Sequence, residues 1–431
     1  MSSPFVLREN SSLRLSIRST RRLAVAFSES RFHRQRNPQH VGTVEDSVLN
    51  HPRSRCLSIA RGGRITYTTS MSWETQLRSK RYDLVDSFAA NEFYQAKGWT
   101  DGLPVVPPTE ERVGECLDVA GLAPGDVIGI ERVRQRPITA EKAAINAVLA
   151  GCLPAYMPVV VAVLRAMCDE KYNLHGTSAS TGGTAPFIVV NGPVRKLIGM
   201  NATHNVLGNG NRPNATIGRA IRLVLINLLG VIPGEMDRST LGHPGKFTFC
   251  IAEDEEDSPW TPLAQERDIP AGESAVTVLA AGAPRQIMNE WTHDPEEILE
   301  TFAAEMRHNM LTYSVWAGNY FLVIPKQLRD LLAAGRWQKH DIQEYIFRSA
   351  RVLRRDWAKV GKTNIVDRSG GPTQEFTALR EPGDLLIVAA GGPAGGFGAV
   401  IPPWLGSKGR AVTKAIEIAV SGTRCNDDTC S

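Results

Sequence analysis

Hydrophobic and polar residues follow two patterns along the chain from about residue 71. In one, apolar positions recur every three to four residues, as in 73–98, which predicts amphipathic helices. In the other, short β-branched and apolar runs predict strands; these runs lie at 186–193, 274–282, 320–325 and 384–393. Because such helices and strands alternate, the pattern predicts an α/β fold of two lobes, each with a mostly parallel sheet flanked by helices.

Helix-end signals support this pattern. Pro108 and Thr109 precede two glutamates, and Thr139 precedes a long apolar run, so we expect helices to start at both threonines. Gly98 marks the end of the first helical stretch. The apolar stretch 144–167 is interrupted by two prolines, which favours two buried helices over a membrane span.

An acidic, aperiodic stretch at 253–272 separates the periodic segments. We therefore expect an N-terminal lobe at 71–255 and a C-terminal lobe at 270–431 with a flexible cysteine-containing tail. The cleft between two lobes is the default place for a small-molecule ligand.

Charge is distributed unevenly. Residues 1–70 contain twelve arginines and four acidic residues, a net charge of +8, so the rest of this chain of net charge +4 carries −4. The basic balance therefore gives no argument for nucleic-acid binding. Residues 1–70 fit an overlong gene start before Met71, a targeting peptide, or a disordered basic arm. Seven cysteines at irregular spacings are typical of a cytoplasmic protein.

Three histidines lie in loops rich in glycine and asparagine: His175, His204 and His243. Loop histidines held by rigid elements suit acid–base catalysis, and we favour His175 or His204 for that role. The alternatives are histidines without a catalytic role, or metal ligands, although no HxxxH or HExxH spacing supports a metal. The cofactor is therefore unknown. No nucleotide-cofactor motif is present, because the glycine loop at 391–400 leads into prolines and not a helix.

The segment 201–222 combines asparagines, glycines and arginines at the start of a helix. Helix-end amides and guanidinium groups favour a carboxylate or phosphate. We expect this ligand to contact Asn209, Arg212, Asn214 and Arg219, with Thr177 and Ser178 of the loop 173–184 opposite. An asparagine-rich loop that satisfies its own backbone is the alternative. Asp101 is either a turn residue or a third catalytic group.

The tail contains Cys425 and Cys430, which could exchange with a substrate or a partner, or bind a soft metal. The alternative is a solvent-exposed tail with incidental cysteines. Asp427 and Asp428 between them would raise the thiol pKa and lower reactivity.

Three segments resemble an uncharacterised bacterial family: 98–113, 140–167 and 173–201. The family is associated with UGSC-type (seleno)proteins and is compared with subunits of glycine and proline reductases. The resemblance implies an α/β enzyme that is a thiol or selenol oxidoreductase component. This chain has no U/C-G-S-C motif, so no functional residue is carried over.

Three hypotheses follow. The first is a soluble enzyme, hydrolase- or lyase-like, acting on a small anionic substrate between the lobes. The second is a thiol-dependent oxidoreductase that uses the C-terminal cysteines. The third is a non-catalytic subunit of a complex. The expected partners are a small molecule and a second copy or partner subunit, without nucleic acid or membrane.

Overall fold

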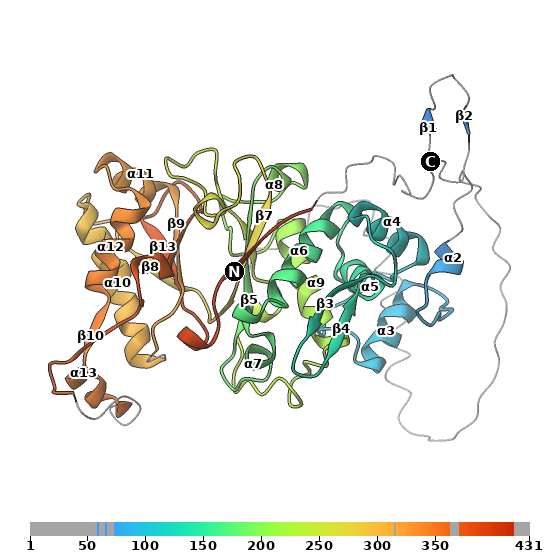
Figure 1. The fold of residues 1–431 in the computed structure, drawn as a ribbon, viewed down its shortest axis with the longest axis horizontal. Helices are drawn as coiled ribbons and strands as arrows, with labels where there is room; N and C mark the ends of the chain where they lie inside the picture. The colour runs from blue at the N-terminus through green and yellow to red at the C-terminus, as the bar shows by residue number, and fades with distance from the viewer. Residues whose placement is uncertain (1–57, 60–64, 67–72, 314–315, 363–369, 418–431) are drawn as a thin grey trace, which may run out of the picture. The chain divides into compact units, whose positions relative to one another are not determined.

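A pair of four-stranded sheets forms the centre of residues 71–431 in the computed structural model, with helices on the outer face of each sheet (Figure 1). The structure describes residues 58–59, 65–66, 73–313, 316–362 and 370–417. Residues 71–431 form a unit separate from residues 1–70. In the latter, β1 (Ser58–Ile59) pairs antiparallel with β2 (Ile65–Thr66). The other predictions for residues 1–70 lie outside the described residues.

The first sheet has the order β14-β7-β5-β6 and the second has the order β12-β9-β13-β8. The strands of the first sheet are β5 (Ala185–Asn191), β6 (Cys250–Ala252), β7 (Ala275–Ala281) and β14 (Val412–Ala415). Those of the second are β8 (Arg285–Met288), β9 (Tyr320–Ile324), β12 (Leu385–Ala389) and β13 (Phe397–Ile401). The described strands also form two small antiparallel pairs, β3 (Val127–Glu131) with β4 (Arg136–Thr139) and β10 (Arg351–Leu353) with β11 (Glu375–Thr377).

An α/β fold is confirmed, but the prediction of mostly parallel sheets is not. Each four-stranded sheet contains one parallel pair, β5 with β6 or β9 with β12, and two antiparallel pairs. The parallel strands are those joined through helices, as a crossover requires. The remaining strands enter the sheets through other connections. The alternation of predicted helices and strands did not indicate these connections.

Side chains alternate along the central strands between two cores. On β5, Phe187 and Val189 point to the second sheet, whereas Ile188 and Val190 point to the helices. The aromatic rings of Phe187 and Phe321 of β9 meet edge to face between the sheets, with centroids 5.0 Å apart. The space between the sheets is thus a packed hydrophobic core, and helices cover both outer faces.

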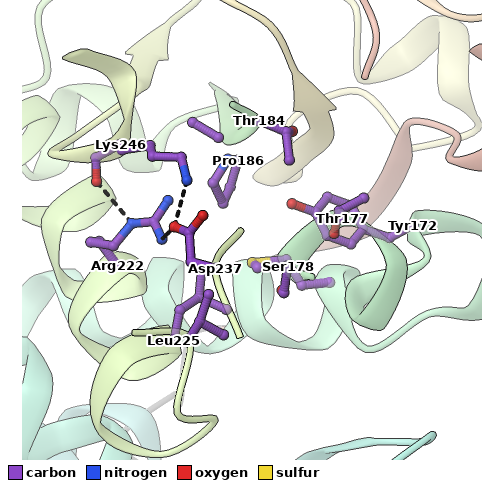
Figure 2. Close-up of a pocket in the computed structure, with 12 residues that line it drawn as sticks. Tyr172, Thr177, Ser178, Thr184, Pro186, Arg222, Leu225, Asp237 and Lys246 are labelled. Carbon is purple, nitrogen blue, oxygen red and sulfur yellow. Dashed lines mark hydrogen bonds and ion pairs between the residues drawn. The ribbon is translucent and has the colours of Figure 1, made fainter. Parts of the chain in front are cut away.

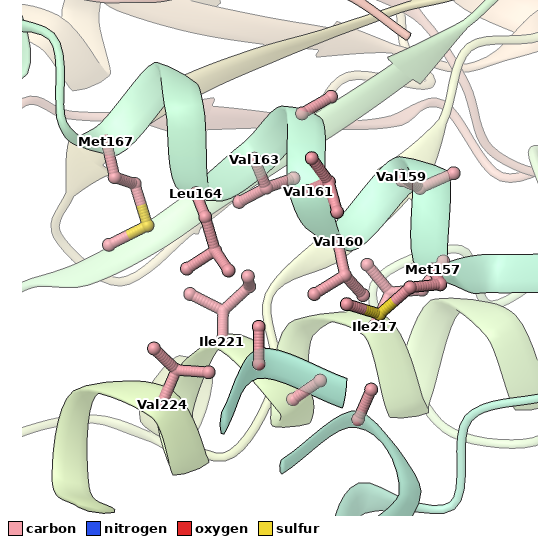
Figure 3. Packing of buried hydrophobic residues seen from close by; sticks show 14 of the residues in the cluster. Met157, Val159, Val160, Val161, Val163, Leu164, Met167, Ile217, Ile221 and Val224 are labelled. Atoms are coloured by element: carbon pink, nitrogen blue, oxygen red, sulfur yellow. The ribbon is translucent and has the colours of Figure 1, made fainter. Parts of the chain in front are cut away.

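The helices on the outer side of the first sheet are α4 (Glu110–Ala120), α5 (Ala140–Ala150), α6 (Met157–Met167) and α9 (Arg212–Asn227). The helices on the outer side of the second sheet are α10 (Pro295–Thr312), α11 (Lys326–Ala334), α12 (Lys339–Ser349) and α13 (Arg354–Lys359). The remaining described helices are α2 (Trp73–Gln76), α3 (Ser87–Lys97), α7 (Leu174–Ser178) and α8 (Val194–Leu197). Figure 3 shows Val160 and Leu164 of α6 against Ile221 of α9, buried side chains on facing helix surfaces.

Several local predictions are confirmed. Thr109 caps α4 by accepting a hydrogen bond from the Arg112 amide, and α5 begins directly after Thr139. The proline-interrupted stretch 144–167 forms most of α5 and the whole of α6. Helix prediction at 73–98 was too long, because only α2 and α3 form there. Each helix in the described part of the chain is too short or too polar to cross a membrane.

The boundary expected near 253–272 does not separate the sheets. Strands β7 and β14 follow it in sequence, yet both are hydrogen-bonded into the sheet that contains β5 and β6. The acidic stretch 253–257 instead leaves β6 and forms a buried junction with the second sheet, where the Asp254 amide donates to the Ala389 carbonyl. The acidic stretch lacks a helical or strand pattern of hydrophobic residues because it forms this junction.

A candidate anion-binding pocket

One small pocket, here called the Arg222 pocket, opens beside the start of β5. The space in it that a water-sized sphere can reach is about 10 Å³, room for about one water molecule, so a carboxylate or phosphate enters only when lining side chains shift. Its lining residues are Met167, Tyr172, Thr177, Ser178, Thr184, Ala185, Pro186, Arg222, Leu225, Val231, Asp237 and Lys246. All of them lie before the expected lobe boundary, so the pocket belongs to the first half of the fold.

Two loops form opposite walls of the pocket. Asn173 adopts a left-handed conformation and starts the short helix α7 by accepting a hydrogen bond from the Gly176 amide. The second loop, 237–246, is attached to the first where the Thr240 amide donates to the Thr181 carbonyl. Next to this bond the backbones of Gly183 and Gly242 approach so closely that a Cβ on Gly183 would lie 2.5 Å from the Gly242 Cα.

Arg222 projects from α9 into the pocket (Figure 2). It is 8% exposed, and its Nε donates to the Lys246 carbonyl at 2.9 Å. Its terminal Nη1 lies 3.9 Å from Asp237 Oδ2, too far for a hydrogen bond. Within the described part of the chain, neither Nη1 nor Nη2 has a hydrogen-bond acceptor. The fork of the guanidinium, which matches a carboxylate or phosphate, is therefore unused.

Lys246 and Asp237 form an ion pair beside this guanidinium, with Nζ and Oδ2 2.5 Å apart. Lys246 Nζ also donates to Ser239 Oγ at 2.7 Å. Burial alone would raise the pKa of Asp237, but hydrogen bonds from Lys246 and Ser239 outweigh it and lower the pKa. Asp237 is therefore ionised at neutral pH. Two cations share one carboxylate, so these three side chains carry a net charge of +1.

Burial also lowers the pKa of Lys246, and the positive charge of Arg222 acts in the same direction. The hydrogen bond to Asp237 opposes this shift without cancelling it. A lysine whose pKa lies closer to neutrality is better suited to give and accept a proton than an ordinary lysine. Lys246 is thus the titratable amine of the pocket.

Hydroxyl groups complete the lining. Thr184 is 7% exposed, and its buried Oγ1 has no hydrogen-bond partner among the described residues. The loop 173–184 also contributes Thr177 and Ser178. Thr177 Oγ1 donates to the Leu174 carbonyl, so it supports the fold of α7. Thr177 and Ser178 line the pocket beside Arg222 and not beside the predicted Arg212 or Arg219.

Asp101 and Arg219, predicted as site residues, bind each other. Arg219 Nε and Nη2 donate to the two carboxylate oxygens of Asp101, each at 2.8 Å. Nη2 also donates to the carbonyls of Leu103 and Pro104. The pair links the turn at Asp101 to α9, which is a structural role.

The remaining predicted anion ligands also hold the backbone in place. Arg212 donates from Nε and Nη2 to the Gly151 carbonyl at the end of α5. Asn214 exchanges two hydrogen bonds with the backbone of Asn201, and the Asn209 carbonyl accepts from Asn205. The asparagine-rich loop satisfies its own backbone, the alternative that the sequence left open.

The three predicted histidines are not brought together. His175 Nδ1 lies 3.5 Å from the buried carboxylate of Glu131, and its ring is outside the pocket lining. His204 is exposed next to Gly392, near the second sheet. His243 Nδ1 accepts from the Gly245 amide, and burial lowers its pKa. The described residues contain no group of three potential ligands that could hold a metal, so the predicted metal site at these histidines is wrong.

In the glycine loop after β12, the amides of Gly395 and Gly396 both donate to Gln327 Oε1, so these amides are occupied by the protein itself. Cys425 and Cys430 lie outside the described residues.

Sequence reasoning missed Arg222, Asp237 and Lys246. Arg222 was visible as one of three arginines in a single segment, but helical spacing alone does not tell which of them faces a cavity. Asp237 and Lys246 lie in a loop of mixed composition, and only the glycine-rich stretch around His243 hinted at a close approach of backbones. No known family model matches the chain, and the search of curated proteins likewise found no match.

Proposed function

We propose that the protein is an enzyme that binds a small carboxylate- or phosphate-bearing substrate in the Arg222 pocket. One observation carries this proposal: a guanidinium buried beside a lysine keeps its two terminal amino groups without acceptors in the pocket. Arg222 shares the single carboxylate of Asp237 with Lys246, so the group keeps a net positive charge, and an anionic ligand that occupies the fork would offset the cost of burying it. The unpartnered Thr184 hydroxyl, also in the pocket lining, supports a polar ligand.

Lys246 takes the acid–base role that the sequence suggested for His175 or His204. Its lowered pKa favours proton transfer, and Asp237 orients the amine through a short ion pair. Proton transfer at an anion held by Arg222 is hydrolase- or lyase-like chemistry. Ser178 and Thr184 are the hydroxyls placed to orient the rest of the substrate.

Binding is tested by isothermal titration calorimetry of the full chain with inorganic phosphate and with acetate as probe anions. Arg222→Met should weaken the affinity for the better probe at least tenfold, because the guanidinium fork is lost. Arg212→Met is the matched control, since it removes an arginine from the same helix and from the site that the sequence suggested. Absence of binding by the wild type, or equal losses in both variants, would refute the pocket.

Catalysis needs a separate test. A panel of small phosphate esters and hydroxy acids is assayed with the wild type, with Lys246→Met, and with Lys196→Met as an exposed-lysine control. The expected loss of turnover for Lys246→Met is about 100-fold or more. Wild-type turnover by Lys246→Met excludes this lysine as the acid–base group, and no turnover of any compound by the wild type reduces the proposal to a binding site.

The thiol hypothesis remains a prediction, because Cys425 and Cys430 lie outside the described residues. The described cysteines do not replace them as reactive thiols. Burial raises the pKa of Cys116 and of Cys152 to about 12 and that of Cys168 to about 11, which leaves little thiolate at neutral pH.

A further inference from the structure

Ser239, at the edge of the Arg222 pocket, has the contacts of an activated nucleophile. Its Oγ lies 2.7 Å from Lys246 Nζ, and the same Nζ lies 2.5 Å from Asp237 Oδ2. A hydroxyl within hydrogen-bonding distance of a base, with the base oriented by a third group, is the arrangement from which serine nucleophiles act. Lysine takes the place of histidine as the base in some of these enzymes. Ser239 is only half-buried, so a substrate can reach it.

Asp237 fixes the positions of both the hydroxyl and the amine. Its Oδ1 accepts from the Ser239 amide at 3.1 Å and from the Ser239 hydroxyl at 2.6 Å. Its Oδ2 accepts from Lys246 Nζ, as the close-up of the pocket shows (Figure 2). The bonds to Oδ1 are sufficient to hold the turn that contains Ser239. The further contact of the hydroxyl with the amine is the one that a purely structural serine does not need.

Arg222 supplies the cation next to this pair. Its Nη1 lies 3.9 Å from Asp237 Oδ2, so the guanidinium is beside the carboxylate that holds Ser239 and Lys246. A carboxylate bound in the fork of Arg222 would bring the rest of its molecule to the Ser239 hydroxyl. We propose that Ser239 is a catalytic nucleophile with Lys246 as its base, and that the substrate is a small carboxylic acid that also carries an ester or amide bond. This inference rests on the proposed function, because it takes Arg222 as the anion-binding group.

The reaction starts from the neutral form of Lys246. In that form the Ser239 hydroxyl turns from Asp237 to Lys246 Nζ, and its Oγ attacks the carbonyl carbon of the ester or amide. The hydroxyl proton passes to Nζ, and the leaving alcohol or amine takes this proton as its bond to the carbonyl carbon breaks. Water then hydrolyses the ester formed on Ser239 with the same lysine as base, which releases the acid and restores the hydroxyl.

Lys246 is the group near Ser239 whose charge changes between pH 7 and pH 10. Asp237 is already ionised, because its pKa is lowered, and Arg222 remains a cation. Burial lowers the pKa of His243, so its ring is neutral in this range. Burial raises the pKa of Tyr172, on the pocket wall near Arg222, so its hydroxyl stays protonated. The reactivity of Ser239 should therefore follow the deprotonation of Lys246.

The test is covalent modification of the full chain by methanesulfonyl fluoride, a small electrophile whose sulfur bonds to a serine Oγ as fluoride leaves. Mass spectrometry of the intact protein and of its peptides should find one modification, at Ser239. Its rate should rise with pH, with a midpoint below the ordinary lysine pKa of about 10.4. Ser239→Ala should abolish the modification. Ser258→Ala is the control, because Ser258 is also half-buried and its Oγ contacts a backbone amide.

Lys246→Arg separates a base from a structural contact. A guanidinium keeps the positive charge and can donate to Ser239 and Asp237, but it does not accept the proton. The modification rate should fall about 100-fold, with the fold verified by circular dichroism. An unmodified Ser239 in the wild type, or a wild-type rate in Lys246→Arg, overturns the proposal.

Calorimetry with acetate on the same preparations distinguishes this proposal from the proposed function. Acetate binding that depends on Arg222, together with an unreactive Ser239, refutes the nucleophile and leaves the anion site intact. A reactive Ser239 without acetate binding supports the nucleophile and overturns the carboxylic acid as the substrate.

Discussion

Asp101 and Arg219 face each other in a two-bond ion pair that joins a surface turn to α9. The side chain of Asp101 is 4% exposed and that of Arg219 is 14% exposed. Burial alone would raise the pKa of Asp101, but the hydrogen bond and the positive charge of Arg219 outweigh it and lower the pKa. A pair this well shielded contributes to stability, unlike most ion pairs at the surface.

Replacement of Asp101 by asparagine should therefore destabilise the protein by about 3 kcal/mol at pH 7, because Arg219 loses its counter-ion. The folded-state pKa of Asp101 is below its unfolded value, which lies near 3.9. The stabilisation is thus complete above that value and disappears as the pH falls through the folded-state pKa. Urea unfolding of both proteins at pH 7 and at pH 3 measures the difference.

Asp83→Asn is the control for this prediction, because its side chain is 89% exposed and pairs only with Arg81 among the described residues. It should change the free energy of unfolding by less than about 0.5 kcal/mol. A stability difference between Asp101→Asn and the wild type that persists unchanged at pH 3 would contradict the role assigned to the ionised carboxylate.

Much of the fold was predictable from the sequence because local patterns determine local structure. The capping hydrogen bond of Thr109, the start of α5 directly after Thr139 and the strand at 275–281 appear where the residues predict them. Sheet membership was not predictable. Strand β14, near the end of the described chain, pairs with β7, and nothing in either segment specifies a partner so distant in sequence.

The site was only partly predictable for a similar reason. The loop containing Thr177 and Ser178 was identified from its composition, and it does line a pocket. Composition also drew attention to Arg212 and Arg219, but a guanidinium can bind a carbonyl or a carboxylate of its own chain as readily as a ligand. Only the three-dimensional structure shows that Arg222 alone of these three arginines faces the pocket.

Glu253 and Lys339 form a buried ion pair between the two halves of the fold. Glu253 is 0% exposed and accepts hydrogen bonds from Asn191 and the Leu263 amide, while Lys339 Nζ lies 3.4 Å from its carboxylate. Lys339→Met should destabilise the protein by about 3–5 kcal/mol, because the carboxylate loses its cation in the interior.

A double-mutant cycle separates the pair from its surroundings. Glu253→Gln combined with Lys339→Met should cost less than the sum of the two single changes, since neither charge is then left unpaired. Guanidinium unfolding of the four proteins measures the coupling. Strict additivity would show that Lys339 acts mainly through Glu266, whose carboxylate lies 3.0 Å from its Nζ.

Gly183→Ala should disturb the Arg222 pocket without adding or removing a charge. The new methyl group would lie 2.5 Å from the Gly242 Cα and 2.8 Å from its amide nitrogen, and backbone atoms cannot move aside cheaply. We expect a loss of about 1–3 kcal/mol in stability and a weaker affinity for the probe anions, measured by thermal unfolding and calorimetry. Gly125→Ala, with no atom within 4 Å of its Cβ, should leave both quantities unchanged.

Anion binding by the pocket should fall at alkaline pH earlier than an ordinary lysine would allow. The pKa of Lys246 is below its usual value, so the ammonium loses its charge at a lower pH, and the local net charge then falls from +1 to 0. Lys246→Arg should remove this decline, because a guanidinium stays protonated throughout the accessible range. Calorimetric titrations with phosphate between pH 8.5 and pH 10 compare the two proteins, because phosphate is a dianion throughout this range, which lies well above its second pKa. An alkaline decline of the same size in Lys246→Arg would show that another group controls binding, and the role given to Lys246 in the pocket would be lost.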